Sequence, residues 1–363
     1  MSPVSVVKIG TSSISSESGE LDASALVKLA DDLAGARASG HCIVLVLSGA
    51  IAAGMPALGM HARPSDVGTL QAIAAVGQPR LFQQMHELLG ARGIVAGQVL
   101  LTPYDFAHRS QYLHARATLQ RLVDLDVLPI VNENDTVADD GVRYGDNDRL
   151  AALVSHLVRA QLLLLLTDTE GLFTADPRVD AAASLIEEII EVDEALERVA
   201  GGAGTERGSG GMASKLAAAK IAAWSGVRAV IASAATPEVV SRAVEGQAVG
   251  TVFPPRPARL ASRKLWIAFG QDAQGRVIVD AGARRALVDG GKSLLAAGVR
   301  EVDGEFDSDA AVEIGGDDGR VFAKGLSRYS AGQLRAVAGK RTSELPEGLP
   351  HEVVHRDDLV VLP

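Results

Sequence analysis

The feature that most constrains the fold is an alternation of short apolar runs with longer amphipathic stretches, repeated through the first two thirds of the chain. The apolar runs are Val4–Ile9, Cys42–Leu47, Ile94–Leu101, Val127–Val131, Leu162–Leu166 and Val227–Ile231. The stretches with helical periodicity are Asp22–Ala38, Thr69–Gly90, Ser110–Leu125, Asp148–Val158, Met212–Trp224 and Pro237–Val244. A strand that is apolar throughout is typically buried on both faces of its sheet. We therefore predict an α/β fold in which helices sandwich a mainly parallel sheet.

The alternation stops at a proline-rich segment, Pro254–Pro257, whose composition is typical of a stiff linker. Beyond it the chain holds short strand-like pieces separated by frequent glycines, and no further alternation of strands with long helices. This pattern indicates a second, small β-rich domain. We predict a first domain over residues 1–255, a linker over residues 256–263 and a β-rich domain over residues 264–363.

Composition and charge exclude several classes of protein. Hydrophobic residues make up 47% of the chain, which is enough to fill large cores. The net charge of −10 falls entirely within the first 255 residues and argues against broad attraction to nucleic acid or to an anionic membrane. The single cysteine, Cys42, excludes an internal disulfide and a cysteine-rich zinc site. No apolar run reaches the ~18 residues that span a bilayer, and no signal-peptide pattern opens the chain, so we expect a cytoplasmic protein without a membrane anchor.

Polar segments follow the predicted strands at the points where a ligand site of an α/β sheet is built. Lys8–Ser12 ends the first strand, and Leu47–Ala50 ends the second. Two acidic loops, Asn132–Asp135 and Gly145–Asp148, come next, followed by the glycine-rich loop Gly208–Lys215, which runs into a helix. The carboxyl ends of parallel strands meet at one edge of the sheet, and a helix start offers free backbone N–H groups to a phosphate.

The two acidic loops form an unusual surrounding for an anionic ligand. Their carboxylates and amides are Glu133, Asp135, Asp146, Asp148, Asn134 and Asn147. An anion could bind among them only if cations came from elsewhere, and Lys8 and Lys215 are the candidates. Asparagine, aspartate and glycine are also ordinary turn residues, so either loop taken alone is equally compatible with a plain turn.

Taken together and in order, these segments resemble the amino acid kinase superfamily, and within it the glutamate 5-kinase family. The resemblance rests on Val7–Ser12, Ser48–Gly54, Val131–Asp135, Gly145–Asp148, Leu166–Asp168, Gly171–Arg178 and Gly210–Lys215. Two later segments, Gly282–Val299 and Gly325–Ser330, resemble a PUA domain. The chain departs from the family pattern at Ser209, where threonine is common, and at Asp309, where a turn glycine is usual.

The resemblance implies ATP-dependent phosphorylation of the γ-carboxylate of L-glutamate to L-glutamyl 5-phosphate, the first step of proline biosynthesis. With a reference pKa near ~4.3, this carboxylate is already ionised at neutral pH and needs no general base. Charge neutralisation and alignment of two anions would carry the catalysis. ATP would be the co-substrate with Mg²⁺, which would be held mostly by phosphate and water, and we assign no protein residue as a metal ligand.

The resemblance also implies roles for individual residues. Lys8 and Lys215 would flank the transferring phosphoryl group, and Asp148 would orient both lysines. The residues expected to bind the amino acid are Ser48, Asn134, Asp135, Asp146 and Asn147. The residues expected to bind ATP are Lys8, Gly10, Thr167, Asp168, Ser209, Gly210, Gly211, Met212 and Lys215.

Partners are expected on the same basis. They are proline as a feedback inhibitor, glutamyl phosphate reductase as the consumer of the acyl phosphate, and further copies of the chain in a dimer or tetramer. Two alternatives stay open. The acceptor could be N-acetylglutamate, carbamate, aspartate or UMP, or the chain could be an RNA-binding protein acting through its PUA-like domain, although its charge makes nucleic acid an unfavoured partner.

Overall fold

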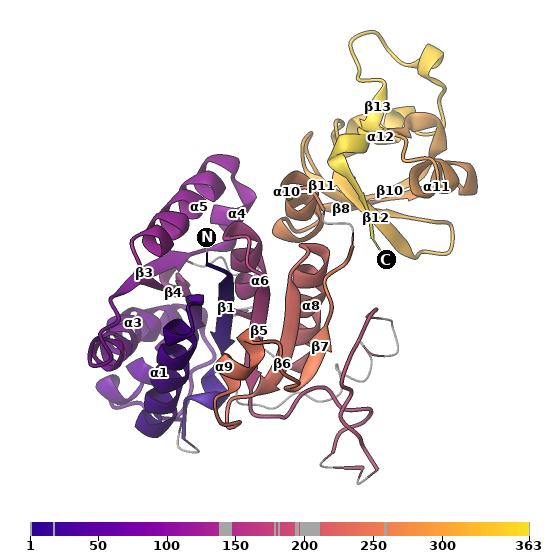
Figure 1. Ribbon diagram of the computed structural model, residues 1–363. Coiled ribbons are helices and arrows are strands. Elements are labelled where there is room, and N and C mark those ends of the chain that lie inside the picture. The colour runs from indigo at the N-terminus through magenta and orange to yellow at the C-terminus, as the bar shows by residue number, and fades with distance from the viewer. Residues whose placement is uncertain are drawn as a thin grey trace. The chain divides into compact units, whose positions relative to one another are not determined.

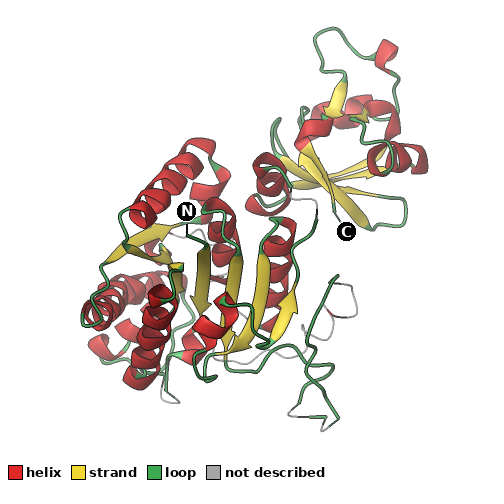
Figure 2. Ribbon diagram, viewed as in Figure 1, coloured by secondary structure: helices red, strands yellow, loops and turns green. Residues whose placement is uncertain are grey.

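The computed structural model describes residues 2–16, 19–137, 147–177, 179–180, 182–192, 196, 211–257 and 260–362 (Figures 1 and 2). The chain forms two compact units, residues 1–259 and residues 260–363. Each unit has its own hydrophobic core. The boundary between the units falls inside the segment predicted as a linker.

A seven-stranded sheet forms the centre of the larger unit. Its strands are β1 (Val4–Ile9), β2 (Cys42–Leu47), β3 (Ala96–Leu101), β4 (Leu128–Glu133), β5 (Leu162–Thr167), β6 (Arg228–Ser233) and β7 (Thr251–Phe253), in the order β3-β4-β2-β1-β5-β6-β7. Neighbouring strands are parallel except β6 and β7, which are antiparallel. The predicted mainly parallel sheet is confirmed, with β1 in its middle, whereas the short edge strand β7 was not predicted.

Helices cover both faces of this sheet (Figures 1 and 2). The helices of the larger unit are α1 (Ala23–Ala38), α2 (Ala50–Gly54), α3 (Val67–Gly90), α4 (Pro103–Ala107), α5 (Arg109–Asp124), α6 (Asn147–Leu157), α8 (Met212–Trp224) and α9 (Val239–Val244). Helices α1, α3 and α9 share one core with the inward-facing residues of the strands. Helices α5, α6 and α8 contact the strands without entering that core, so they cover the opposite face.

Capping residues explain where two of the long helices begin. The Asp22 side chain accepts hydrogen bonds from the backbone N–H groups of Ser24 and Ala25, and Asp66 accepts one from Thr69. These carboxylates satisfy donors that a first helical turn leaves unpaired. The helices therefore start one residue after Asp22 and Asp66, close to the predicted starts.

Small residues bring the end of β2 close to α3. Gly49 has φ +113°, a backbone region that favours glycine, and it turns the chain from β2 into the short helix α2. A Cβ added at Gly54 would lie 2.2 Å from the Ile73 carbonyl oxygen, and one at Gly77 would lie 1.8 Å from the Ala50 carbonyl oxygen. Helices α2 and α3 are therefore in backbone contact, which holds the start of α2 against the middle of α3.

The smaller unit is β-rich, as predicted. It contains a five-stranded sheet of order β10-β8-β11-β12-β14 and a two-stranded sheet of β13 and β9. The strands are β8 (Gly275–Val279), β9 (Leu294–Leu295), β10 (Val299–Gly304), β11 (Ala311–Gly315), β12 (Val321–Leu326), β13 (Glu352–Val354) and β14 (Leu359–Val361). Its helices are α10 (Ser262–Leu265), a π-helix (Trp266–Gly270), α11 (Ala281–Val288) and α12 (Ala331–Val337). Helix α10 begins within the segment predicted as a linker.

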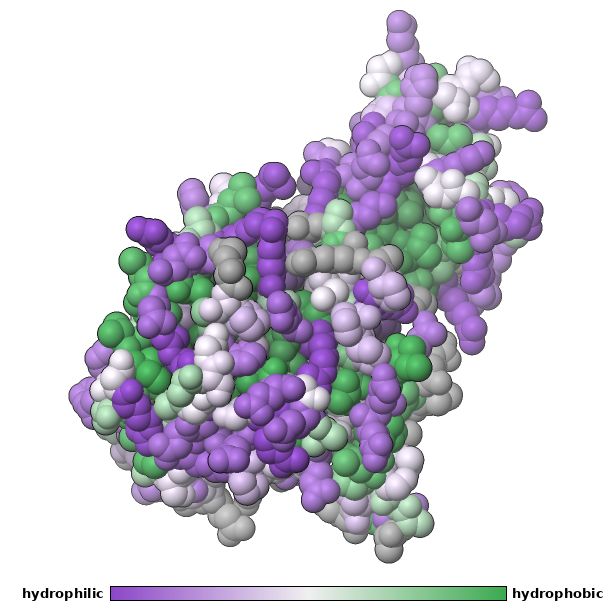
Figure 3. All heavy atoms as spheres, in the orientation of Figure 1, coloured by the Kyte–Doolittle hydropathy of each residue, from purple (hydrophilic) through white to green (hydrophobic). Residues whose placement is uncertain are grey.

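Within the described residues, no helix is long and apolar enough to cross a membrane. The visible face of the larger unit in Figure 3 carries hydrophilic and hydrophobic side chains interspersed with one another. The long apolar segments identified in the sequence are instead buried strands of the sheet.

The turn before β11 contains a residue in an unfavourable backbone conformation. Asp309 has φ +67°, a backbone region that is strained for residues that carry a Cβ and that glycine adopts freely. We expect Asp309→Gly to raise the stability of the protein by about 0.5–1 kcal/mol, because relief of this strain outweighs the greater unfolded-state freedom of glycine. Differential scanning calorimetry of the full chain should show a small rise in Tm. Asp317→Gly is the matched control, since Asp317 has an ordinary φ, and it should leave Tm unchanged or lower it. A fall in Tm for Asp309→Gly would contradict the strain.

Candidate active site

Three charged side chains from distant parts of the sequence meet at the carboxyl-terminal edge of the larger sheet. Lys8 lies near the end of the central strand β1, and Asp148 and Lys215 lie in the first turns of α6 and α8. Lys8 Nζ is 2.6 Å from Asp148 Oδ1, and Lys215 Nζ is 3.2 Å from Asp148 Oδ2. All three residues are buried, with exposed fractions of 4%, 1% and 5% in sequence order. One carboxylate therefore holds two ammonium groups, one at each of its oxygens.

The protonation of Asp148 is governed by these two lysines. Burial alone would raise the pKa of Asp148, but coulombic attraction and hydrogen bonds from Lys8 and Lys215 outweigh burial and hold that pKa below its ordinary value. The Ser214 hydroxyl also donates a hydrogen bond to Asp148 Oδ2, at 3.2 Å. The carboxylate is therefore ionised at neutral pH, and the Lys8–Asp148–Lys215 cluster carries one net positive charge.

Local structure explains why this cluster forms. In register, Lys8 pairs with Val46 of β2 and Leu165 of β5, so its backbone is fixed on both sides. A carboxylate is favourable in the first turn of a helix, whereas an ammonium group there opposes the helix dipole. Asp148 is therefore well placed at the start of α6, and its charge offsets the cost of Lys215 at the start of α8. Helices α6 and α8 pack against each other, which brings the two first turns together.

A second polar cluster lies at the carboxyl ends of β2 and β4. Asn147, the first residue of α6, donates from Nδ2 to Ser48 Oγ at 2.8 Å and to Asn132 Oδ1 at 2.9 Å. Asn132 in turn donates from Nδ2 to Gln78 Oε1 at 2.6 Å. Ser48, Asn132 and Asn147 are all buried. The structure thus joins two residues predicted to bind substrate, Ser48 and Asn147, through one amide.

The loop after β4 carries two more of the predicted substrate residues. Burial raises the pKa of Asp135 to about 6, although the charge of Arg63 acts in the opposite direction. Asn134 is half-buried, and its Oδ1 accepts a hydrogen bond from the Thr136 hydroxyl at 2.6 Å. Asn134 therefore stabilises its own turn and does not bond to Asn147 in the structure. Asp146, the fifth predicted substrate residue, lies outside the described residues.

The glycine positions predicted to face ATP lie beside the lysines. Gly10 follows β1 with φ −83°, and a Cβ there would lie 3.4 Å from Lys8 Nζ. Gly211 is the N-cap of α8, and Met212 is the first residue of that helix. The N-terminal N–H groups of α8 therefore face the same edge as Lys215 and can bind a phosphate. Ser209 and Gly210 lie outside the described residues.

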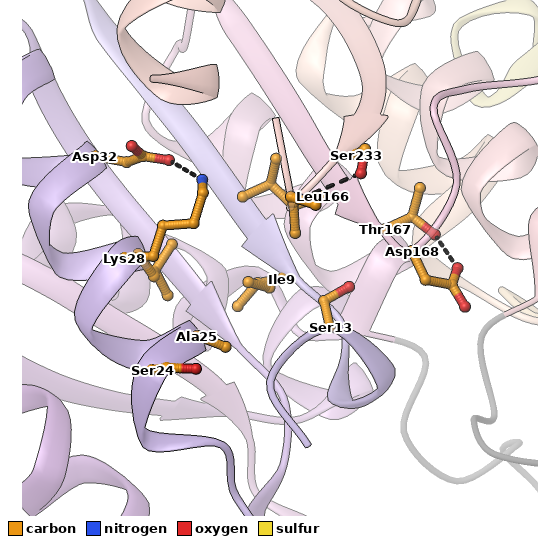
Figure 4. A pocket seen from close by; sticks show the side chains of 13 residues that line it. Ile9, Ser13, Ser24, Ala25, Lys28, Asp32, Leu166, Thr167, Asp168 and Ser233 are labelled. Atoms are coloured by element: carbon orange, nitrogen blue, oxygen red, sulfur yellow. Dashed lines mark hydrogen bonds and ion pairs between the residues drawn. The ribbon is translucent and has the colours of Figure 1, made fainter. Parts of the chain in front are cut away.

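A pocket of about 370 Å³ lies beside the carboxyl ends of β1, β5 and β6 (Figure 4). Thr167 and Asp168 lie on one side of it, with the Thr167 hydroxyl donating to Asp168 at 3.0 Å, and Lys28 and Asp32 of α1 lie on the other. Ile9 and Leu166 contribute apolar lining. Its volume is typical of a site for a small molecule. The described lining does not include Lys8, Asp148 or Lys215, so the pocket is separate from the charged cluster.

The described residues contain no group of three or more His, Cys, Asp or Glu side chains that could hold a metal ion. Among the residues that the structure describes, Asp148 pairs with both lysines and is therefore already engaged. The described side chains therefore do not provide enough ligands to bind a metal ion without other groups. This arrangement is compatible with Mg²⁺ that keeps waters and binds through the phosphates of a nucleotide.

Several residues of these clusters were not predicted as site residues. Ser214 is not among the predicted site residues, although its place beside Lys215 in the first turn of α8 was a signal for it. Asn132 was predicted as part of an acidic loop, whereas the structure places it in β4 and shows its bond to Asn147. Gln78 lies in the middle of a long helix, and nothing in its surroundings in the sequence marks it.

Comparison with known proteins gives the class. The amino acid kinase family model matches residues 3–233, and the PUA domain model matches residues 275–349. The chain therefore belongs to the amino acid kinase family and carries a C-terminal PUA domain.

Similar proteins with assigned names identify a more specific family within the amino acid kinases. The chain is 46% identical to the glutamate 5-kinase of Cupriavidus pinatubonensis, over 98% of this chain and 97% of that one. It is 45% identical to the glutamate 5-kinase of Vibrio campbellii, over 98% and 95% of the two chains. Among solved structures, a UMP kinase from Ureaplasma parvum matches with a TM-score of 0.47 and 14% identity, over 70% of this chain and 99% of that one. The chain is a member of the glutamate 5-kinase family.

Proposed function

We propose that this chain transfers the γ-phosphoryl group of ATP to the γ-carboxylate of L-glutamate. The product is L-glutamyl 5-phosphate, and the reaction is the first step of proline biosynthesis. The observation that carries the proposal is the buried cluster of Lys8 and Lys215 on one carboxylate, Asp148. Family membership and the names of the relatives support the choice of acceptor.

The chemistry requires two anions to approach each other. The γ-carboxylate of glutamate, with a pKa near ~4.3, is ionised at neutral pH and attacks without a general base. Lys8 and Lys215 neutralise charge on the transferring phosphoryl group from two sides. Asp148 holds both ammonium groups in place and does not accept a proton, since its low pKa makes it a poor base. Preorganised charges of this kind act strongly where water is excluded.

The amino acid is proposed to bind beside this cluster. Ser48 and Asn147, joined by a hydrogen bond of 2.8 Å, contact its polar groups, and Asp135 pairs with its ammonium group. Asn134 and Asp146 belong to the same two loops and are proposed to shape this site. The carboxylates of the loops then recognise a cation on the substrate, while the lysines recognise its anionic end.

The nucleotide is proposed to bind on the other side of the lysines. Its phosphates lie against the start of α8, and the residues that contact it are Lys8, Gly10, Thr167, Asp168, Ser209, Gly210, Gly211, Met212 and Lys215. The pocket that Thr167 and Asp168 border is proposed to hold part of the nucleotide. Mg²⁺ is held by phosphate oxygens and water, and supplies further charge neutralisation when bound.

We propose partners that fit this reaction. Proline is a feedback inhibitor, because it shares the α-amino acid group that the glutamate site recognises. An acyl phosphate reacts readily with water, so glutamyl phosphate reductase is the expected consumer of the product. The chain is proposed to form a dimer or tetramer and to work in the cytoplasm. Its kinase domain is proposed to span residues 1–255, followed by a linker over 256–263 and the PUA domain over 264–363.

The proposal is tested by trapping the product. The protein is incubated with Mg-ATP, L-glutamate and hydroxylamine, and γ-glutamyl hydroxamate is measured. Parallel reactions contain N-acetylglutamate, carbamate, aspartate or UMP, and ADP release is followed in all of them. Hydroxamate from glutamate alone, lowered by added proline, supports the proposal. ADP release with another acceptor would move the substrate assignment, and no turnover with any acceptor would direct attention to RNA binding by the PUA domain.

The raised pKa of Asp135 predicts a pH dependence of glutamate binding. Because this pKa is about 6, the carboxylate is ionised above pH 6 and becomes neutral below it, where it no longer pairs with the substrate ammonium. We expect KM for glutamate, at saturating Mg-ATP, to rise about tenfold between pH 7.5 and pH 5. Asp135→Asn should have a higher KM at pH 7.5 and a much flatter pH profile. Equal profiles for the two proteins would remove Asp135 from ammonium recognition.

A further inference from the structure

We propose that Gln78, in the middle of α3, is a positioning residue for the amino-acid site. It accepts a hydrogen bond from the NH₂ group of Asn132 and so holds in place the hydrogen-bond chain Gln78–Asn132–Asn147–Ser48, which presents its last two members to the substrate. The inference rests on the proposed function, because it concerns how the glutamate site selects a free α-amino acid. Each link of the chain is a hydrogen bond of 2.6–2.9 Å.

The direction of this chain follows from a backbone group that can only donate. The Glu133 backbone N–H donates to Asn132 Oδ1 at 2.9 Å, so this atom must be the amide oxygen. The other terminal atom of Asn132 is then the NH₂ group, which requires an acceptor, and Gln78 Oε1 supplies it. The atom of Asn147 that faces Asn132 Oδ1 must likewise be its NH₂ group. Every amide in the chain therefore has one orientation.

This orientation determines what is left for a ligand. Both N–H bonds of Asn147 are used, one to Asn132 and one to Ser48. Asn147 Oδ1 is buried and has no hydrogen-bond partner among the described residues, so it is free to accept from an ammonium group. Ser48 Oγ accepts from Asn147, which leaves its hydroxyl proton to be donated to a carboxylate. An acceptor beside a donor matches the ammonium and the α-carboxylate of an amino acid.

The backbone contact between α2 and α3 explains why a residue of α3 can reach this site. A Cβ at Gly77 would lie 1.8 Å from the Ala50 carbonyl oxygen and 2.5 Å from the Gly54 backbone nitrogen. The absence of a side chain at Gly77 lets α3 approach the turn that carries Ser48. Gln78, the next residue, then lies within 2.6 Å of Asn132 at the end of β4. Gly77 thus allows the close approach of α3, and Gln78 makes the hydrogen bond that this approach permits.

The test measures kinetics of the full-length protein with Gln78→Met, which keeps the size of the side chain and removes the acceptor. Without that acceptor the buried NH₂ group of Asn132 is unpaired, so Asn132 and the Asn147 bonded to it are held less firmly. We expect kcat/KM for glutamate to fall about 5–15-fold, through KM, because one partly buried hydrogen bond to a buried amide is lost. The kcat and the KM for ATP should stay within about twofold of wild type. Gln78→Ala, with the best helix former at this position, should change the parameters in the same direction.

The matched control is Gln84→Met, the same substitution at an exposed position of the same helix, which should leave all parameters unchanged. A double-mutant cycle then separates positioning from a general structural effect. In an Asn147→Ala background the chain no longer reaches the substrate, so adding Gln78→Met should lower kcat/KM by less than about twofold. A purely structural role of Gln78 would give the same loss in both backgrounds.

The outcomes distinguish the inference from the proposed function. If wild-type protein phosphorylates glutamate but Gln78→Met keeps the wild-type KM for glutamate, the inference is wrong and the function stands. Additive losses in the cycle would also overturn it. If wild-type protein does not phosphorylate glutamate, the proposed function is wrong and the inference falls with it.

Discussion

Replacing Lys215 by alanine should lower kcat for glutamate phosphorylation about 10²–10³-fold, the scale observed when one preorganised charge donor is removed from a site. Lys215 is 5% exposed and lies 3.2 Å from Asp148 at the start of α8, where phosphates can also bind the helix N-terminus. Its charge has no substitute within this cluster, since Lys8 approaches from the opposite side of the carboxylate. The loss should appear in kcat, because the interaction strengthens as charge develops during transfer.

The measurement is steady-state ADP release with glutamate and Mg-ATP both varied. Lys220→Ala is the matched control, because Lys220 lies on the same helix outside the Lys8–Asp148–Lys215 cluster, and it should retain kcat within about twofold. Lys215→Arg keeps the charge but changes its shape, so it should recover part of the loss. Turnover near that of wild type in Lys215→Ala would exclude Lys215 from catalysis.

Replacing Asp148 by alanine should have the second large effect, on stability as well as on activity. The substitution leaves two buried ammonium groups, Lys8 and Lys215, without their shared counter-charge, which typically costs about 3–5 kcal/mol. Activity should fall at least as far as in Lys215→Ala, because both lysines lose their position. Chemical denaturation and thermal unfolding of the full chain would measure the stability loss.

The stability that Asp148 contributes depends on pH. The sign of this dependence follows from the pKa of Asp148, which is held below its ordinary value in the folded protein. Its ionisation contributes stability that is fully present above the unfolded-state pKa of ~3.9 and is lost as the pH falls through the lower folded-state pKa. The difference in stability between wild type and Asp148→Ala should therefore be largest near neutral pH and should shrink below about pH 4. A difference that grows on acidification would contradict the ion pairs.

A triple variant separates stability from activity at this cluster. Replacing Lys8, Asp148 and Lys215 together by apolar residues of similar size removes the buried charges as a set. Such replacements are often neutral or stabilising, so the triple variant should recover the stability that Asp148→Ala loses. It should remain inactive. This pattern would indicate that the cluster is retained for chemistry and not for folding.

Much of this fold could be predicted because it depends on a strong, local pattern. Continuous apolar runs such as Leu162–Leu166 can hardly be anything but buried strands, and the structure places β5 there. The parts that were missed have weak patterns. Strand β7 has only three residues, and α2 has five residues, mainly alanine and glycine. These elements form because of their neighbours in space, which a local pattern does not contain.

The candidate site also contains residues that could be predicted from the sequence and residues that could not. Lys8, Asp148 and Lys215 stand at ends of strands and starts of helices, so their positions alone suggested that they would meet at one edge. The contribution of Gln78 could not be predicted, because its partner Asn132 is far away in the sequence and the contact depends on how closely α2 and α3 pack. The roles assigned to all these residues remain predictions until the variants are measured.

The central position of β1 also governs how the protein is assembled during synthesis. One edge of β1 pairs with β2, at residues 42–47, but the other edge pairs with β5, at residues 162–167. A nascent chain emerging from the ribosome therefore holds an open strand edge until β5 has been made, and such edges promote aggregation. Lys8 is translated well before its partners on α6 and α8, which follow more than a hundred residues later. Incomplete chains that end before α8 cannot form the charged cluster, so premature termination yields an inactive product that chaperones or proteases must remove.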